Sequence, residues 1–216
     1  MYYTNISQQH LPSLRVLNVT GDGKVMTTAS YVQLQIEVST QGKNVHEAQQ
    51  ENTNIMNRVI QSIIALNIPR EDIQTASYTI LPSYDFIDGK QVFKGYEVTN
   101  AISVKVSDIS QVGTVIDSAV QNGANRITSI QFKIENTDLY YQQALSLALQ
   151  NAQMKARTIA ETMQLSLYPQ PIEIVEENNS GPVLYKSIAM ADQTISTPIE
   201  QGQMTISATV RVKFQY

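Results

Sequence analysis

The two histidines are the residues of this sequence best suited to catalysis, and neither has the neighbours that catalysis needs. His10 lies in the polar, aperiodic start of the chain, and His46 lies in the first turn of a predicted helix, on its polar face. A Ser-His-Asp triad holds its histidine between a nucleophile and a carboxylate. We therefore interpret both as solvated surface histidines. Two histidines are too few for a multi-histidine metal site, and the absence of cysteine removes thiolate ligands and a thiol nucleophile.

Acidic residues offer a second possible chemistry. Glu173 and Glu177 share one face of a predicted strand and lie about 13 Å apart at the usual strand rise, which is too far for the carboxylate pair of a retaining glycosidase. A solvated sheet face explains them. Asp85 and Asp88 fit no EF-hand spacing, and a turn already explains Asp88. The sequence therefore gives no catalytic residue, no metal ligand and no cofactor site, and we expect that the chain is not an enzyme.

Two short motifs resemble phosphate-binding or RNA-binding sequences without completing them. The stretch GDGK at 21–24 lacks the length and the Lys-Ser/Thr ending of a P-loop and is interpreted as a tight turn. The stretch KGY at 94–96 matches the opening of an RNA-recognition motif. Glu97 then adds negative charge, and Val98 stands where a stacking aromatic residue is needed. Since the net charge is -4 as well, we expect no nucleic-acid partner.

An aromatic-rich arm at residues 82–95 is the feature that stands out. Pro82 lies inside a predicted strand, and because proline cannot donate to a ladder, this part is an edge, a bulge or a protruding arm. The Asp88-Gly89 pair predicts a hairpin. Exposed rings need cover, and aromatic residues are enriched at protein interfaces. We expect the arm to pack on another subunit, or else on the second unit of its own chain. The expected interface residues are Tyr84, Phe86, Phe93 and Tyr96.

Alternating and helical spacings of apolar residues predict the elements that position these residues. Three helices are expected, at 45–66, 109–120 and 139–164. Asn44 is the expected N-cap of the first helix, with Glu47 completing a capping box. The third helix carries an alanine at every fourth position, which allows close approach to a sheet or to another helix. The predicted strands are 14–21, 31–39, 73–87, 96–106, 130–134, 172–177 and 204–214, with a further candidate strand at 183–190.

Glycine and asparagine residues mark the expected chain reversals. The first strand is expected to end at Gly21-Asp22-Gly23. Gly123 follows the last apolar residue of the second helix, where a left-handed residue commonly closes a helix. The polar stretch around it is therefore interpreted as a reversal between helix and strand. The expected structural turn positions are Gly21, Gly23, Gly89, Gly95, Gly123 and Asn125.

The order of the elements predicts an α+β fold. Residues 30–135 follow the order β-α-β-β-α-β, which is the ferredoxin-like pattern. The first strand, the long helix and the late strands, within 13–29 and 136–216, are expected to form a second small α+β unit into which that module is inserted. Residues 1–12 are expected to be a flexible tail.

Five stretches, taken together and in order, resemble the SIMPL-domain family over about residues 14–216. The family often has Pro-Asp before its second strand and Pro-Gly before its last strand, where this chain has TTASYV and Gln201-Gly202. Both departures lie in turns and bear on loop geometry rather than on fold. The stretches are LNVTGDGKV, GYEVTNAISVKVSD, VIDSAVQNGANRITSIQF, ALSLALQNAQMKARTIAETM and ISATVRVKF.

The resemblance implies a bacterial protein of unknown biochemical role. Family members are similar to a periplasmic or surface immunogenic antigen and to proteins linked to oxidative-stress defence, and they form homo-oligomers. The family has no established catalytic residues to carry over, so the matched glycines and Asn125 are expected only as structural positions. Direct redox chemistry has little support, because cysteine is absent and the seven methionines are interpreted as ordinary core fillers.

These observations favour a non-enzymatic, self-assembling scaffold or stress-associated protein whose partner is itself. The alternative is a small-molecule sensor or enzyme with a pocket between the two units. The start MYYTNISQQHLPS lacks a basic region followed by an apolar run, and no window approaches 18 apolar residues. We expect a cytoplasmic protein without a membrane-spanning segment, or an exported, cell-envelope protein if a signal has been removed.

Overall fold

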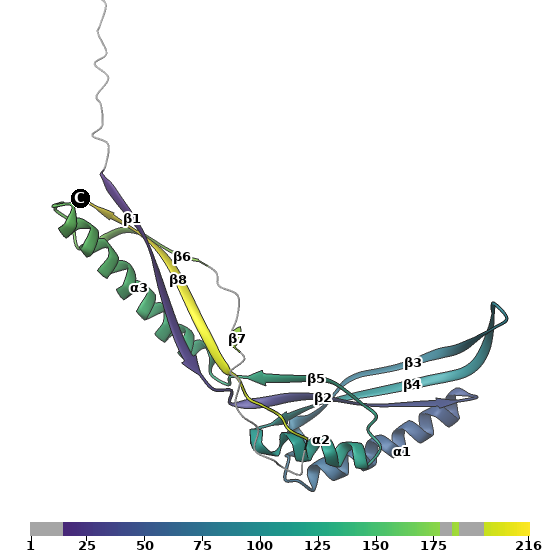
Figure 1. Cartoon of the computed structure of the whole chain (residues 1–216). Coiled ribbons are helices and arrows are strands. Elements are labelled where there is room, and N and C mark those ends of the chain that lie inside the picture. Colours follow the sequence, from purple (N-terminus) through teal and green to yellow (C-terminus); the bar gives the residue numbers. More distant parts are fainter. Residues whose placement is uncertain (1–14, 178–182, 186–196) are drawn as a thin grey trace, which may run out of the picture. The chain divides into compact units, whose positions relative to one another are not determined.

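The structure of the protein is a computed structural model in which helices and antiparallel strands are mixed along the chain (Figure 1). The predicted α+β class is confirmed by two antiparallel sheets and three α-helices among the described residues. The expected flexible tail and part of the candidate strand 183–190 lie outside those residues. The structure describes residues 15–177, 183–185 and 197–216.

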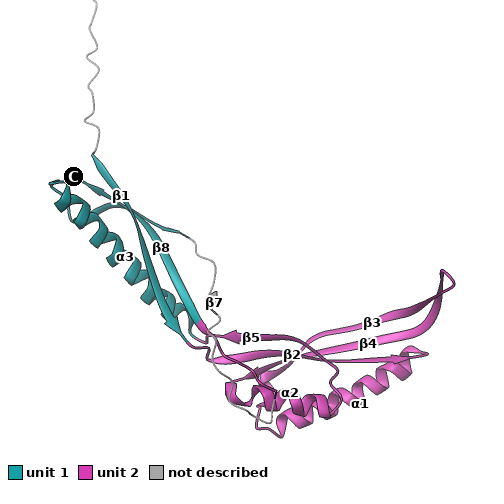
Figure 2. Cartoon of the chain, viewed as in Figure 1, with its two compact units in different colours: residues 1–27, 136–184, 204–216 teal, residues 28–135, 185–203 magenta. Residues whose placement is uncertain are grey.

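The chain divides into two compact units, coloured teal and magenta in Figure 2. The predicted domain division, with a module at 30–135 inserted into a second unit at 13–29 and 136–216, stays a prediction. Unit 1 comprises residues 1–27, 136–184 and 204–216, and unit 2 comprises residues 28–135 and 185–203.

Unit 1 is a long helix packed on an antiparallel sheet. Strand β1 (Val16–Thr27) pairs with β8 (Gln203–Gln215), and β6 (Pro171–Glu177) pairs with the other side of β8. The short strand β7 (Val183–Tyr185) also pairs with β8. Helix α3 (Thr137–Thr162) lies against β1, and its five regularly spaced alanines are buried as predicted. Alternate residues of β8 are buried beneath it, which confirms the predicted alternation of the closing strand.

The prediction that β1 ends in a turn at Gly21 and Gly23 is wrong, because the strand continues to Thr27. A Cβ atom on Gly21 would lie 2.1 Å from the carbonyl oxygen of Ala148. A Cβ atom on Gly23 would lie 1.9 Å from the carbonyl oxygen of Ala144. Glycine occupies these positions because the backbone of α3 rests directly on the strand, which is the other common reason for glycine in a strand.

Unit 2 is a four-stranded antiparallel sheet in the order β3-β4-β2-β5, with α1 and α2 on one face (Figure 1). The chain order β-α-β-β-α-β is the predicted one, and we keep the ferredoxin-like assignment as an interpretation of it. The elements are β2 (Tyr31–Gly42), α1 (Val45–Ile64), the 3₁₀ turn η1 (Arg70–Asp72), β3 (Ile73–Ile87), β4 (Lys90–Val106), the 3₁₀ turn η2 (Ile109–Gln111), α2 (Val112–Gln121) and β5 (Arg126–Lys133).

Branched aliphatic side chains fill the space between this sheet and its two helices. Asn52 of α1 is also fully buried, and its Nδ2 donates to the carbonyl oxygens of Val38 (2.8 Å) and Val98 (3.0 Å). These bonds fix α1 over β2 and β4. The core includes Val32, Leu34, Ile36 and Val38 of β2, Ile102, Val104 and Val106 of β4, Met56, Val59 and Ile63 of α1, and Val112, Val115, Ile116 and Ala119 of α2.

The methionines depart from the predicted role of core filler. Met56 and Met204 are buried, but Met26, Met154 and Met163 are each at least 60% exposed. The prediction is therefore wrong for these three. Met26 lies in β1 on the face opposite to α3, and the other two lie on or just after α3, away from its alanine stripe.

Candidate functional site

The arm at residues 82–95 is built from the distal parts of β3 and β4. β3 is an edge strand, so Pro82 lies at an edge, and the pairing with β4 shifts register just beyond it, between Ser83 and Tyr84. Asp88 and Gly89 connect the strands, with φ angles of 51° and 74°. Two successive positive φ angles are typical of the type I′ turn, whose twist matches that of paired strands. The arm is thus a regular two-stranded hairpin.

The ladder gathers the four predicted aromatic residues on one face of this hairpin, here called the aromatic face. Tyr84 pairs directly with Phe93, and their ring centroids lie 5.7 Å apart in an edge-to-face arrangement. The rings of Phe93 and Tyr96 are 5.3 Å apart in the same geometry. Phe86 lies two residues beyond Tyr84, on the same side, and is 76% exposed. The aromatic face is therefore continuous and largely open to solvent.

Gly95 fixes the base of the arm to β2. Its φ of 150° lies in the range that favours glycine, and a Cβ atom there would lie 2.3 Å from the carbonyl oxygen of Gly42. The neighbouring Lys94 forms an ion pair with Asp85 at 3.2 Å, and both side chains are about half exposed. An exposed pair contributes little to stability. The close backbone contact, rather than the ion pair, therefore sets the direction of the arm.

The structure shows how Gly123 closes α2. Its φ is 110°, its N–H donates to the carbonyl oxygen of Val120, and the N–H of Ala124 donates to that of Ala119. These bonds are the pair that defines a Schellman motif. Gly123 therefore lies at the helix end, as the sequence indicates.

The side chain of Asn125 takes the place of a strand residue beside β2. Its Oδ1 accepts from the backbone N–H of Ser39 (2.9 Å), and its Nδ2 donates to the carbonyl oxygen of Ser39 (2.7 Å). Its own N–H donates to the carbonyl oxygen of Glu37. The amide thus extends the β2–β5 ladder by one step, which is a structural role.

A polar network that the sequence analysis missed lies on the face of the unit 2 sheet opposite to the helices. Glu37 is 91% buried, since its residue exposure is 9%, and its Oε1 accepts from Thr128 Oγ1 (3.0 Å) and Gln35 Nε2 (3.2 Å). Nearby, Glu97 Oε1 accepts from Ser39 Oγ (2.5 Å) and Arg126 Nη2 (3.1 Å). The alternation of β2 could have indicated this network, because it places Glu37 in a row of neutral polar residues on one face of the strand.

This network stabilises the sheet face and lacks the parts of a catalytic site. Oε1 of Glu37 and Oε1 of Glu97 each accept two hydrogen bonds. The network contains no histidine that could activate one of its hydroxyl groups as a nucleophile. The arrangement fits hydrogen-bonded polar groups rather than a poised base.

The remaining acid and histidine candidates are dispersed. His10 lies outside the described residues, and His46 is exposed in the first turn of α1. Glu173 pairs with Lys213 and Glu177 pairs with Arg211 across the β6–β8 ladder. Within the described part of the chain, no group of three or more histidine and acidic side chains gathers in a way that could hold a metal ion.

Among the described residues, three titratable groups have a pKa that is shifted by local hydrogen bonds. Glu176 accepts from the Tyr141 hydroxyl (2.5 Å), and this bond raises the pKa of Tyr141. The bond from Lys105 to Glu135 raises the pKa of Lys105, and the side-chain and backbone bonds from Ser110 lower the pKa of Asp108. All three lie in exposed, structural contacts, and none faces a cavity that could hold a substrate.

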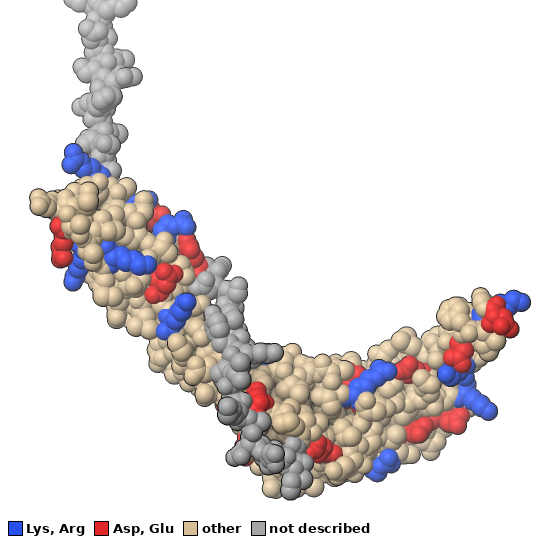
Figure 3. Space-filling model, viewed as in Figure 1, with Lys and Arg blue, Asp and Glu red and all other residues tan. Residues whose placement is uncertain are grey.

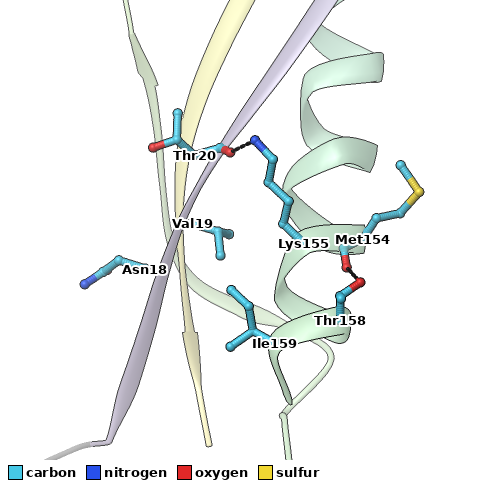
Figure 4. Close-up of a pocket in the computed structure, with 7 residues that line it drawn as sticks. All are labelled: Asn18, Val19, Thr20, Met154, Lys155, Thr158 and Ile159. Atoms are coloured by element: carbon cyan, nitrogen blue, oxygen red, sulfur yellow. Dashed lines mark hydrogen bonds between the residues drawn. The ribbon is translucent and has the colours of Figure 1, made fainter. Parts of the chain in front are cut away.

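A groove of about 560 Å³ runs between β1 and α3 in unit 1 (Figure 4). Lys155 reaches across it, and its Nζ donates to the carbonyl oxygen of Thr20 at 2.7 Å. Val19 and Ile159 point toward one another from the strand and the helix (Figure 4). The groove is lined by Asn18, Val19, Thr20, Met154, Lys155, Thr158 and Ile159.

Charged side chains of both signs are interspersed on the face seen in Figure 3, and the tip of the β3–β4 hairpin carries both signs. A mixed surface of this kind, with a net charge of -4, agrees with the expectation of no nucleic-acid partner, which stays a prediction. Among the described helices, none combines the length and the apolar character needed to cross a membrane.

The sequence is similar to a family of proteins of unknown function. The model of this family, SIMPL, described as "Protein of unknown function (DUF541)", matches residues 17–214. The 26 kDa periplasmic immunogenic protein of Brucella melitensis is 27% identical over an alignment of 213 residues, and the match covers 91% of this chain and 83% of that protein. The uncharacterized protein YggE of Escherichia coli K12 is 26% identical over 159 residues, which are 74% of this chain and 65% of YggE.

Proposed function

The chain belongs to the SIMPL family of proteins of unknown biochemical role, and from this premise we propose that it is a non-enzymatic protein that assembles with copies of itself. In this proposal it acts as a scaffold or stress-associated component. The partner is a second copy of the chain, and the aromatic face of the arm is the contact surface.

The exposed aromatic face is the observation that carries this proposal. Burying one phenylalanine side chain contributes about 1.5–3 kcal/mol, and Phe86 and Phe93 are 76% and 49% exposed. The edge-to-face neighbours of Phe93, Tyr84 and Tyr96, hold its ring in place, so little side-chain entropy is lost when a partner covers it. Rigid aromatic groups of this kind are typical anchors of protein interfaces.

The absence of an assembled catalytic site among the described residues supports the non-enzymatic half of the proposal. The buried Glu37 and the neighbouring Glu97 are engaged by neutral or cationic donors within the sheet. A general base for catalysis needs a lone pair directed at a substrate, and neither carboxylate lines one of the pockets of the described chain.

An envelope location is the part of the proposal that comes from a relative. The Brucella protein is named periplasmic and immunogenic, and by this similarity we infer that the present chain acts outside the cytoplasm. The exported alternative of the sequence analysis is therefore preferred over the cytoplasmic one. A stress-associated role there is supported by the exposed thioethers of Met26, Met154 and Met163, which oxidants convert reversibly to sulfoxides.

The test compares the masses of three proteins by native mass spectrometry and sedimentation velocity. The wild type is expected to form a discrete oligomer, and Phe86→Asp with Phe93→Asp is expected to dissociate it while the circular dichroism spectrum stays unchanged. The matched control is Ile87→Asp with Val92→Asp, which changes two exposed apolar residues on the opposite face of the same arm. That control is expected to remain assembled.

A monomeric wild type would overturn the proposal of self-assembly. An oligomer of unchanged mass in the aromatic double variant would instead show that the arm is not the interface. Assembly lost equally in both double variants would mean that arm folding, rather than the aromatic face, is required.

A further inference from the structure

The sheet of unit 1 has two open edges among the described residues. β8 lies in the centre, β1 forms one edge, and β6 forms the other. An open edge presents unpaired backbone groups that can pair with another strand. The orientation of those groups follows from the register, and it shows which residues would make the contacts.

Even-numbered residues of β1 direct their backbone groups to the open edge. The N–H of Tyr216 donates to the carbonyl oxygen of Arg15 (3.1 Å), and β1 then pairs with β8 without a register shift. Successive strand residues direct their N–H and C=O groups to opposite sides. Odd-numbered residues therefore bond to β8, whereas the backbone groups of Asn18, Thr20 and Asp22 point outward.

Side chains of α3 already satisfy two of these outward groups. Lys155 Nζ donates to the carbonyl oxygen of Thr20 and also lies 3.4 Å from Asp22 Oδ2. Asn151 Oδ1 accepts from the N–H of Asp22 (3.1 Å). The groove in Figure 4 begins at the Lys155–Thr20 contact and extends past Asn18. The edge is thus covered at one end and open at the other.

The open edge of β6 has a complementary arrangement. β6 pairs with the odd-numbered residues of β8 through Glu173 and Val175, so the backbone groups of Ile174 and Glu176 point to the outer edge. The side chain of Ile174 is 53% exposed. Because Ile174 is opposite the buried Val212, it lies on the face of the sheet that α3 covers.

We propose that β6 of a second copy adds to the open edge of β1 as a parallel strand, with its Ile174 beside Val19 and its Glu176 beside Lys155. β1 and β6 are both antiparallel to β8, so they run in the same direction. A copy that continues the sheet therefore presents β6 parallel to β1. This inference rests on the proposed self-assembly and adds a second contact surface to it.

The side chains match at two points along the groove. Ile174 of the added strand lies on the α3 side, where Val19, Met154 and Ile159 provide apolar contact. Glu176 follows two residues later on the same side. Tyr141 of its own chain already donates to its Oε1, so the contact with a partner uses its Oε2. Lys155 lies one helical turn before Ile159. In the parallel orientation, Glu176 of the added strand therefore lies beside Lys155 when Ile174 lies beside Val19 and Ile159. Lys155 then exchanges the Thr20 carbonyl for a carboxylate partner.

The interface is heterologous, since β1 of one copy meets β6 of the next. Such contacts propagate head to tail, and they give a ring when the rotation closes and a filament when it does not. Every copy in a closed ring uses both of its edges, so no edge stays open.

Disulfide trapping tests this pairing in a chain that has no cysteine of its own. Asn18 and Glu173 are both opposite Lys213, so within one chain they lie two strand spacings apart, about 10 Å. That separation exceeds the reach of a disulfide. In the proposed register the two residues lie side by side across the interface. Asn18→Cys with Glu173→Cys is therefore expected to give a ladder of covalent multimers with oxidised glutathione.

The matched control is Met26→Cys with Glu173→Cys. Met26 has the same orientation in β1 but lies eight residues further along, about 26 Å at the usual rise, and it is expected to give no ladder. Each single cysteine variant is expected to give none either. Efficient dimers from Asn18→Cys alone would reveal a symmetric β1–β1 contact and overturn the proposal.

A charge exchange tests the second contact point. Lys155→Glu and Glu176→Lys each place like charges together and are expected to weaken assembly about tenfold. The two substitutions in one chain restore opposite charges and are expected to restore assembly. If the double variant assembles no better than the single variants, these residues do not meet.

The outcomes separate this inference from the proposed function. An oligomeric wild type whose Asn18→Cys, Glu173→Cys variant gives no ladder overturns edge pairing and leaves the arm interface standing. A ladder together with an unaffected aromatic double variant supports edge pairing and removes the arm interface. A wild type that is monomeric throughout overturns both.

Discussion

The two units pack a helix on a sheet in opposite ways. In unit 2, large side chains such as Leu34, Ile36 and Ile63 fill the space between the layers. In unit 1, α3 presents alanines to β1, and two glycines of that strand receive carbonyl oxygens of the helix backbone. The first arrangement gains stability from apolar volume, and the second from close contact between backbones. The two units should therefore differ in which changes of volume they tolerate.

Removing volume should harm unit 2 most. Leu34→Ala is expected to lower the free energy of unfolding by about 4 kcal/mol, because the fully buried side chain leaves a cavity. The counterpart in unit 1, Ala152→Gly, removes one methyl group and is expected to cost about 1 kcal/mol, mostly in helix propensity. Urea denaturation measures both, and equal losses would contradict the comparison.

Adding volume should harm unit 1 most. Gly23→Ala is expected to cost about 3 kcal/mol, because its Cβ would meet a backbone carbonyl that cannot rotate away. Gly89→Ala is the control, since no atom lies within 4 Å of its Cβ and only its φ of 74° opposes the change, at about 1 kcal/mol. If the two variants were equally stable in urea, α3 would be able to shift away from β1.

A smaller effect is expected where unit 2 itself depends on a glycine. Gly123→Val should cost about 1–2 kcal/mol, because a β-branched residue resists the positive φ that closes α2. Its Cβ would also lie 2.6 Å from Ile55 Cγ2. Gly123→Asn tolerates that φ better and is the matched control. The melting temperature of the valine variant should fall below that of the asparagine variant, and identical melting curves would refute the explanation.

Elements with a strong periodic signal were predictable from the sequence. The bounds of β3 were predicted residue for residue, because the Asp88-Gly89 pair that follows it fixes the hairpin. Asn44 accepts from the N–H of Glu47 as predicted. In these places one local rule determines the structure, and the tertiary contacts agree with it.

The errors at the β1 glycines and at Glu37 have a common physical origin, since each depends on a neighbour far away in sequence. Gly21 and Gly23 resemble turn residues until α3, more than 120 positions later, is seen to rest on them. Burial of Glu37 depends on Thr128 from another strand. For the candidate site, the sequence identified the aromatic residues, but their shared face depends on the register shift after Ser83, which the sequence does not encode locally.

The glycine contacts of β1 also limit how α3 can move. Carbonyl groups four residues apart on a helix repeat about every 6 Å, and alternate residues of a strand repeat about every 6.7 Å. The near match lets the helix engage the strand at Gly21 and Gly23 together. If α3 slid along β1 by a fraction of a turn, the carbonyl groups of Ala144 and Ala148 would both lose their positions against the glycines. α3 is therefore held at one position along β1, because Val19 and Val25, the next residues of β1 on that face, carry side chains where a shifted carbonyl would need a glycine.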